Sequence, residues 1–160
     1  MTARGARRLY AKRLAPTDNS KNQVYLGSGF EALNIFPCGE IYDDSSEKNQ
    51  ILKADLEFFW LQPDGGVSQA PNAQLILYPQ YPEVRMSGFL KGAAHAPSDL
   101  MTVREAGRIL FLGIDDAGLV TGAVVSPDDD LAKEFEVAVA GQGERVFYDL
   151  TVGTTAEEAK

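Results

Sequence analysis

Residues 108–125 read RILFLGIDDAGLVTGAVV, and this stretch decides the fold class. Two apolar runs of strand length flank the turn residues Asp115-Asp116-Ala117-Gly118. Glycine at the last of these positions can adopt the positive φ that many tight turns require. We therefore predict a β-hairpin with strands near 108–115 and 118–125.

Similar short apolar runs, separated by Gly, Pro and Asp, occur along the rest of the chain. They predict strands near 7–14, 23–27, 51–60, 74–79, 84–90 and 145–151, with polar loops at 42–50 and 62–73. Short helices are expected at 30–36, from Ser98 to Gly107, and after Ser126, where serine would be the N-cap and Pro127 the first helical residue. The pattern favours a mainly β fold with short α-helices, either a barrel or a sandwich.

The size and composition are those of one soluble globular domain. The chain has 160 residues, of which 44% are hydrophobic and 24% charged. We expect one domain over residues 1–153, and a linker stub or disordered terminus at 154–160. The apolar runs are too short to span a membrane, and no apolar stretch follows the basic N-terminus, so a bacterial cytoplasmic location is expected. The single cysteine, Cys38, excludes an intrachain disulfide.

Charge is distributed unevenly along the chain. Residues 1–25 carry six basic side chains and one acid, whereas the remainder carries a net charge of −13. Such an asymmetry can place a cationic face on an otherwise acidic protein. Within the basic segment Leu9, Ala11 and Leu14 alternate loosely with polar residues, which predicts a half-buried strand with cations on its outer face.

The residues needed for catalysis are sparse. The only histidine, His95, lies in a loop of small residues, and Cys38 is expected to be a partly buried hydrophobic residue. No predicted strand contains the Asp-x-Lys or Glu-x-Lys of a metal-dependent nuclease, and the nearest approximation is Glu83-Val84-Arg85. Asp128-Asp129-Asp130 is typical of a helix start. We therefore expect neither catalytic residues nor metal ligands nor a cofactor, and we expect the chain not to be an enzyme on its own.

Two polar segments remain as candidates for a binding function. The first polar segment is residues 12–23, KRLAPTDNSKNQ, in which amides and cations are denser than a turn requires. Asn and Gln can bind adenine edges, and Lys and Arg can bind guanine or phosphates. We expect Lys12, Arg13 and Lys21 mainly to contact phosphates. Alternatively, the segment is a solvated loop with an Asx-turn at Asp18.

The second polar segment is residues 78–88, YPQYPEVRMSG. Glu83 and Arg85 are two residues apart, so they project to the same side of a strand. Such a pair suits a C·G base pair, since the carboxylate accepts from cytosine and the guanidinium binds guanine. An exposed ion pair without a ligand is the alternative. The DNA-binding candidates of both segments are Lys12, Arg13, Asp18, Asn19, Ser20, Lys21, Asn22, Gln23, Tyr81, Glu83, Arg85 and Ser87.

These segments resemble a known family. LYAKRLAPTD (residues 9–18), followed by QVYL (residues 23–26), resembles the opening of the N-terminal effector domain of EcoRII-type restriction endonucleases. DNSKNQVYLG (18–27) and YPEVRMSGFL (81–90) are closer to restriction enzymes that join such a domain to an MvaI/BcnI-type nuclease. The resemblance extends over about residues 7–140, including the hairpin at 108–125 and the acidic helix start.

The resemblance implies a DNA-binding pseudobarrel, an open barrel of seven or eight strands related to plant B-three transcription-factor domains. In that fold two arms grip the major groove, and they coincide with the two polar segments. It implies that the chain is the monomeric recognition domain of a type II restriction endonuclease. Such a domain would bind double-stranded DNA sequence-specifically at a CCWGG-like site. The linked C-terminal nuclease domain would be the part that uses Mg²⁺. Two alternatives remain: a complete metal-dependent nuclease, and a β-barrel that binds a small ligand or a protein.

Overall fold

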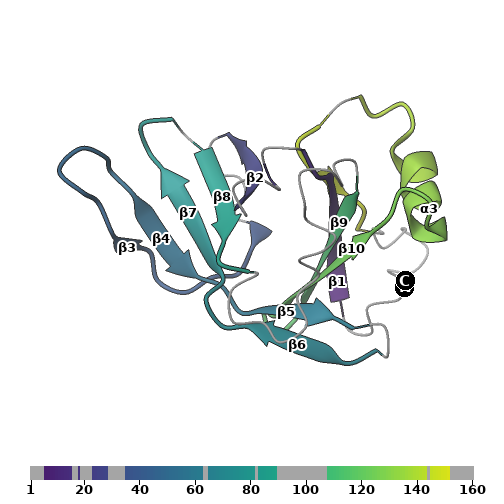
Figure 1. The fold of residues 1–160 in the computed structure, drawn as a ribbon, viewed down its shortest axis with the longest axis horizontal. Coiled ribbons are helices and arrows are strands. Elements are labelled where there is room, and N and C mark those ends of the chain that lie inside the picture. Colours follow the sequence, from purple (N-terminus) through teal and green to yellow (C-terminus); the bar gives the residue numbers. More distant parts are fainter. Residues whose placement is uncertain are drawn as a thin grey trace, which may run out of the picture.

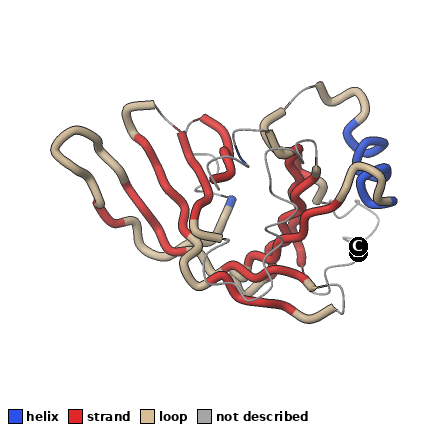
Figure 2. Tube along the Cα trace, viewed as in Figure 1, coloured by secondary structure: helices blue, strands red, loops and turns tan. Residues whose placement is uncertain are grey.

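The computed structural model describes residues 6–15, 18, 23–28, 35–62, 65–81, 83–89, 108–143 and 145–151. These residues form a mainly β structure of two open sheets and the helix α3 (Asp130–Val139) (Figure 1). Figure 2 shows α3 at one end of the molecule, with strands making up most of the rest. Within the described ranges, no helix is both long and apolar enough to cross a membrane.

Sheet A has six strands in the order β11-β1-β9-β10-β5-β6. The strands are β1 (Ala6–Arg13), β5 (Phe58–Leu61), β6 (Val67–Ala70), β9 (Ile109–Asp115), β10 (Val120–Val125) and β11 (Tyr148–Asp149). The predicted hairpin is confirmed, since β9 pairs with β10 in antiparallel register. Gly118, at the turn, has a φ of 84°. The pairing of β10 with β5 is parallel, so the sheet is mixed.

Sheet B has five strands in the order β2-β8-β7-β4-β3. The strands are β2 (Gln23–Ser28), β3 (Tyr42–Asp43), β4 (Leu52–Asp55), β7 (Gln74–Tyr78) and β8 (Glu83–Ser87). All of its pairings are antiparallel. Alternate residues face the main core, where Val24, Val84 and Met86 are completely buried, and the residues between them face outward.

The predicted strand at 51–60 is wrong as a single element, because the chain changes sheet within it. β4 ends at Asp55 in sheet B, and β5 starts at Phe58 in sheet A. At this corner Leu56 N–H donates to the Ala73 carbonyl at 3.0 Å, and Val120 N–H donates to the Glu57 carbonyl at 3.0 Å. The hairpin of β5 and β6 therefore runs along the side where the two sheets meet (Figure 1).

Other predictions differ from the structure in smaller ways. The two segments expected to be polar loops contain the short strands β3 and β6. Ser126 is not the cap of α3. Asp129 is the N-cap, and its carboxylate accepts from Leu131 N–H at 2.9 Å, while the Ser126 carbonyl accepts from Asp129 N–H in a turn before the helix. The predicted helix at 98–107 and most of the one at 30–36 lie outside the described residues.

Aromatic residues fill the core between the sheets. Phe58, Trp60 and Phe89 pack with ring centroids 4.8–6.2 Å apart, and the Trp60 indole donates to the Phe89 carbonyl at 2.8 Å. Gly122 on β10 leaves the space that these rings need, because a Cβ there would lie 2.4 Å from Phe58. A second, smaller core lies on the other face of sheet A, where Phe135 of α3 packs near Phe111 and Tyr148.

Candidate nucleic-acid interface

The last residue of the first polar segment and the second polar segment, far apart in sequence, meet on neighbouring strands of sheet B. β2 pairs with β8, with Gln23 opposite Ser87 and Tyr25 opposite Arg85. Residues opposite one another in an antiparallel pair share a face, and residues two apart on a strand share it too. The β2–β8 surface is therefore the outward-facing set Gln23, Tyr25, Glu83, Arg85 and Ser87, all of them partly exposed.

Arg85 lies at the centre of this surface. Its Nε and Nη2 atoms contact one Glu83 oxygen at 3.2 and 3.0 Å, and its guanidinium lies 5.7 Å from the Tyr25 ring centroid. The side chains of Arg85 and Glu83 retain 19% and 32% of their exposure. The predicted pair on one side of a strand therefore forms, and both of its members reach solvent.

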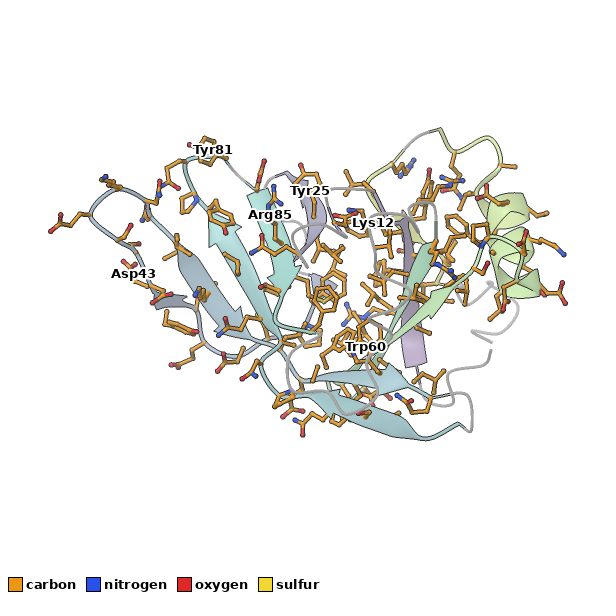
Figure 3. The ribbon with its side chains drawn as sticks, viewed as in Figure 1. Lys12, Tyr25, Asp43, Trp60, Tyr81 and Arg85 are labelled. Atoms are coloured by element: carbon orange, nitrogen blue, oxygen red, sulfur yellow. The ribbon has the colours of Figure 1, made fainter. Side chains whose placement is uncertain are left out.

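Tyr81 lies in the turn between β7 and β8 and is 64% exposed. Figure 3 shows it above Arg85 and Tyr25, on the same side of the molecule. An exposed tyrosine at the tip of a two-stranded hairpin offers both a ring face and a hydroxyl to a ligand. The turn therefore extends the β2–β8 surface outward.

Lys12 and Asp18 lie in the interior. The expectation that Lys12 contacts phosphates and Asp18 contacts bases is therefore wrong. Lys12 is 5% exposed and Asp18 is 1% exposed. The Lys12 ammonium lies 2.8 and 3.0 Å from the two Asp18 oxygens and donates to the Tyr25 carbonyl at 2.7 Å. Burial lowers the pKa of Lys12, and the hydrogen bond to Asp18 opposes that shift. A buried, fully paired cation has no open side for a phosphate, so both residues have a structural role.

The same ion pair covers an open strand edge. β2 is an edge strand of sheet B, and Tyr25 N–H donates to Asp18 at 3.1 Å instead of to another strand. The Tyr25 carbonyl accepts from Lys12, which belongs to β1 of sheet A. The Lys12–Asp18 pair thus supplies, with side chains, the hydrogen bonds that a neighbouring strand would supply in a closed barrel.

Arg13 is turned toward α3 and away from the β2–β8 surface. It forms an ion pair with Glu136 at 2.6 Å and donates to the Tyr148 hydroxyl at 3.1 Å. Its guanidinium lies 5.0 Å from the Phe135 ring centroid. Hydrogen bonding to Glu136 raises the pKa of Arg13 above its already high ordinary value. Arg13 therefore holds α3 on sheet A, and the expectation that it contacts phosphates is wrong.

The remaining candidates of the first polar segment, Asn19, Ser20, Lys21 and Asn22, lie outside the described residues. So does His95. Cys38 is partly buried, and burial raises the pKa of its thiol. Among the residues that the structure describes, no group of three His, Cys, Asp or Glu side chains is arranged to hold a metal ion.

Sequence reasoning missed Tyr25 and a polar continuation of this face. Gln74 on β7 lies opposite Ser87, and its amide donates to the Tyr42 hydroxyl at 2.7 Å and to Asp55 at 3.2 Å. Lys53 on β4 forms an ion pair with Asp44 at 2.6 Å, and hydrogen bonding to Asp44 raises the Lys53 pKa. The alternation of polar and apolar residues in β2, β4 and β8 was the available signal, once the order of the strands is known.

A groove lies on a different part of the molecule, beside α3. It has a volume of about 560 Å³ and lies between the helix and the outer face of sheet A. Its apolar lining comes from Leu9, Phe111, Leu131, Phe135, Ala138 and Leu150. Glu134, Gln142, Asp149 and Thr151 complete the lining.

Comparisons of the chain with protein-family models, with curated proteins and with solved structures found no match.

Proposed function

We propose that the protein binds double-stranded DNA in a sequence-specific manner, with the β2–β8 surface and the Tyr81 turn as its contact region. One observation carries the proposal: Gln23, the last residue of the first polar segment, lies opposite Ser87 of the second in sheet B, and Glu83 and Arg85 are presented together on its outer face. The major groove admits a two-stranded β-ribbon, and the turn that joins β7 to β8, which are flanked by β4 and β2 in sheet B, carries the exposed Tyr81. The proposal takes the two open sheets as halves of a pseudobarrel.

The side chains of this surface have the chemistry of base recognition. Arg85 can bind the O6 and N7 atoms of guanine, Glu83 can accept from the cytosine amino group, and Gln23 can bind adenine. Ser87 can donate to or accept from either kind of base edge. Lys21 and its neighbours remain sequence-based candidates for phosphate contacts. The resemblance to restriction endonucleases further suggests a recognition domain linked to a separate nuclease domain, with a short CCWGG-like site.

Selection from a random duplex library tests this proposal. The purified protein is incubated with the library at low salt, bound duplexes are separated by gel shift, and the selected pool is sequenced. We expect a short shared motif, and affinity for it that falls steeply as salt rises, because cations released from phosphates drive binding. No binding at low salt, or equal affinity for every duplex, would contradict the proposal. Metal-dependent cleavage of the selected duplex would favour a complete nuclease instead.

The groove beside α3 favours a second candidate, the binding of a small apolar ligand. Its volume is in the range of ligand sites, and its lining is mainly apolar. A thermal-shift screen with small apolar compounds tests it, with Leu131→Glu as the variant that places a charge in the groove. Stabilisation of the wild type that the variant loses, and that duplex DNA does not alter, would support this candidate. Absence of any stabilising compound would argue against it.

A further inference from the structure

The buried ion pair and the proposed DNA surface meet at one residue, Tyr25. Its backbone N–H and carbonyl are bound by Asp18 and Lys12, on the side of β2 that faces away from β8. Tyr25 and Arg85 are therefore a non-hydrogen-bonded pair of the β2–β8 ladder, the kind in which side chains approach most closely. The backbone of Tyr25, from which the ring projects, is thus held by bonds to the interior pair.

The ring in turn lies beside the exposed arginine. The Arg85 guanidinium and the Lys12 ammonium each lie 5.7 Å from the Tyr25 ring centroid. An aromatic ring at this distance attracts a cation, and it also limits the orientations that a long side chain can adopt. Glu83 restrains the same guanidinium through two contacts to one oxygen. Arg85 is therefore held between a ring and a carboxylate.

Asp18 also fixes the chain that leads into β2. One of its oxygens accepts from Ala15 N–H at 2.8 Å, and the other accepts from Tyr25 N–H. A single buried carboxylate thus joins Ala15, two residues after the end of β1, to Tyr25 within β2. The interior pair is thus connected to both polar segments. Asp18 itself belongs to the first segment, and Tyr25, whose ring lies beside Arg85, links the pair to the second.

We propose that Lys12 and Asp18 are positioning residues that set the sequence preference of the β2–β8 surface by fixing Tyr25 and, through its ring, Arg85. The inference rests on the proposed function. Neither residue touches DNA in this arrangement. Their contribution is the orientation of a guanidinium, and bidentate recognition of guanine depends strongly on orientation.

The test uses the double variant Lys12→Met/Asp18→Asn, which removes both charges together and so leaves no unpaired buried charge. Asparagine retains an oxygen that can accept from the backbone. The measured quantity is the ratio of affinities for the selected duplex and for a scrambled duplex, in protein shown to be folded by its thermal transition. We expect this ratio to fall by roughly tenfold or more. A folded double variant with an unchanged ratio would overturn the inference.

A matched control and a second pair of variants keep the test decisive. Lys133→Met/Asp130→Asn removes another Lys–Asp pair, one on α3 that no contact joins to Tyr25 among the described residues, and should leave the ratio unchanged. Tyr25→Leu, which removes the ring, should lower the ratio by about tenfold, and Tyr25→Phe, which keeps the ring, should lower it less. If the first double variant does not fold, a folded Tyr25→Leu protein with the wild-type ratio overturns the inference.

Failure of the proposed function would be recognised separately. Wild-type protein that does not distinguish the duplexes overturns the proposed function and the positioning role together. Wild-type protein that does distinguish them, beside a double variant that does so equally well, overturns the positioning role alone.

Discussion

Arg13 on β1 and Arg85 on β8 each pair with a glutamate and each lie beside an aromatic ring. The two sites differ in what they join. Arg13 connects β1 to Glu136 of α3 and to Tyr148, residues more than a hundred positions away. Arg85 pairs with Glu83, two residues earlier on its own strand. An ion pair within one strand adds little to tertiary structure, so Arg85 can exchange its partner for a ligand without loosening the fold.

The largest effect on stability is expected at neither arginine but at the buried pair between the sheets. Asp18→Ala leaves the Lys12 cation buried without a counter-charge and removes acceptors from Ala15 and Tyr25. Removing one partner of a buried ion pair costs about 3–5 kcal/mol. Urea denaturation should show this loss, with Asp44→Ala as the exposed control. A loss below about 1 kcal/mol would mean that the pair is open to water.

The next effect separates the arginines by function. Arg85→Ala should weaken binding of the selected duplex by about 1–3 kcal/mol, because one base-reading side chain is removed. Arg13→Ala should leave that affinity nearly unchanged, since its side chain is turned toward α3. Gel-shift titration of both variants with the same duplex measures the difference. Equal losses in the two variants would remove the distinction drawn between the two sites.

The free energy of unfolding should distinguish the two arginines in the opposite way, with the larger loss at Arg13. Arg13→Ala loses an exposed ion pair, a hydrogen bond to Tyr148 and packing on Phe135, and about 1–2 kcal/mol is expected from these together. Thermal or urea unfolding should show the loss, and Arg13→Lys should recover only part of it, because lysine cannot reproduce the planar fork. Full recovery with lysine would assign the effect to charge alone.

The smallest effect is expected for the pair on β8. A double-mutant cycle of Glu83→Gln and Arg85→Ala should give a coupling of about 0.5 kcal/mol or less in unfolding free energy. The same cycle measured in DNA affinity should give a clearly larger coupling if both side chains read one base pair. Similar couplings in both measurements would indicate that the pair serves the fold alone.

The parts of this fold that could be predicted are the local ones. The hairpin of β9 and β10 carries its own turn and two apolar runs, so nothing distant is needed to identify it. No local sequence pattern marks the change of sheet at Leu56 and Glu57. Both residues fit a continuous strand, and the break depends on hydrogen bonds to Ala73 and Val120, which are distant in sequence.

The candidate site shows the same division. Glu83 and Arg85 were predicted to share one side of a strand, which follows from alternation alone. The burial of Lys12 and Asp18 could not be read from the sequence, because charged residues in a polar segment are ordinarily solvated. Their burial depends on the open edge of β2, a property of the assembled sheets. The prediction of the N-cap of α3 was wrong for a simpler reason. Ser126 and Asp129 are both good N-cap residues, and only the turn between them, which the structure shows, decides which one caps the helix.

The interior position of β1 in sheet A, between β11 and β9, affects how the chain folds. β1 precedes both of its partners in the chain by about a hundred residues or more, since β9 and β11 are residues 109–115 and 148–149. Sheet B, in contrast, is built entirely from residues 23–87. Pairing between distant segments is slow, because the entropy of closing a long loop must be lost before the contacts form. During synthesis, sheet B can therefore assemble before β9 and β11 are made, and β1 finds its neighbours last.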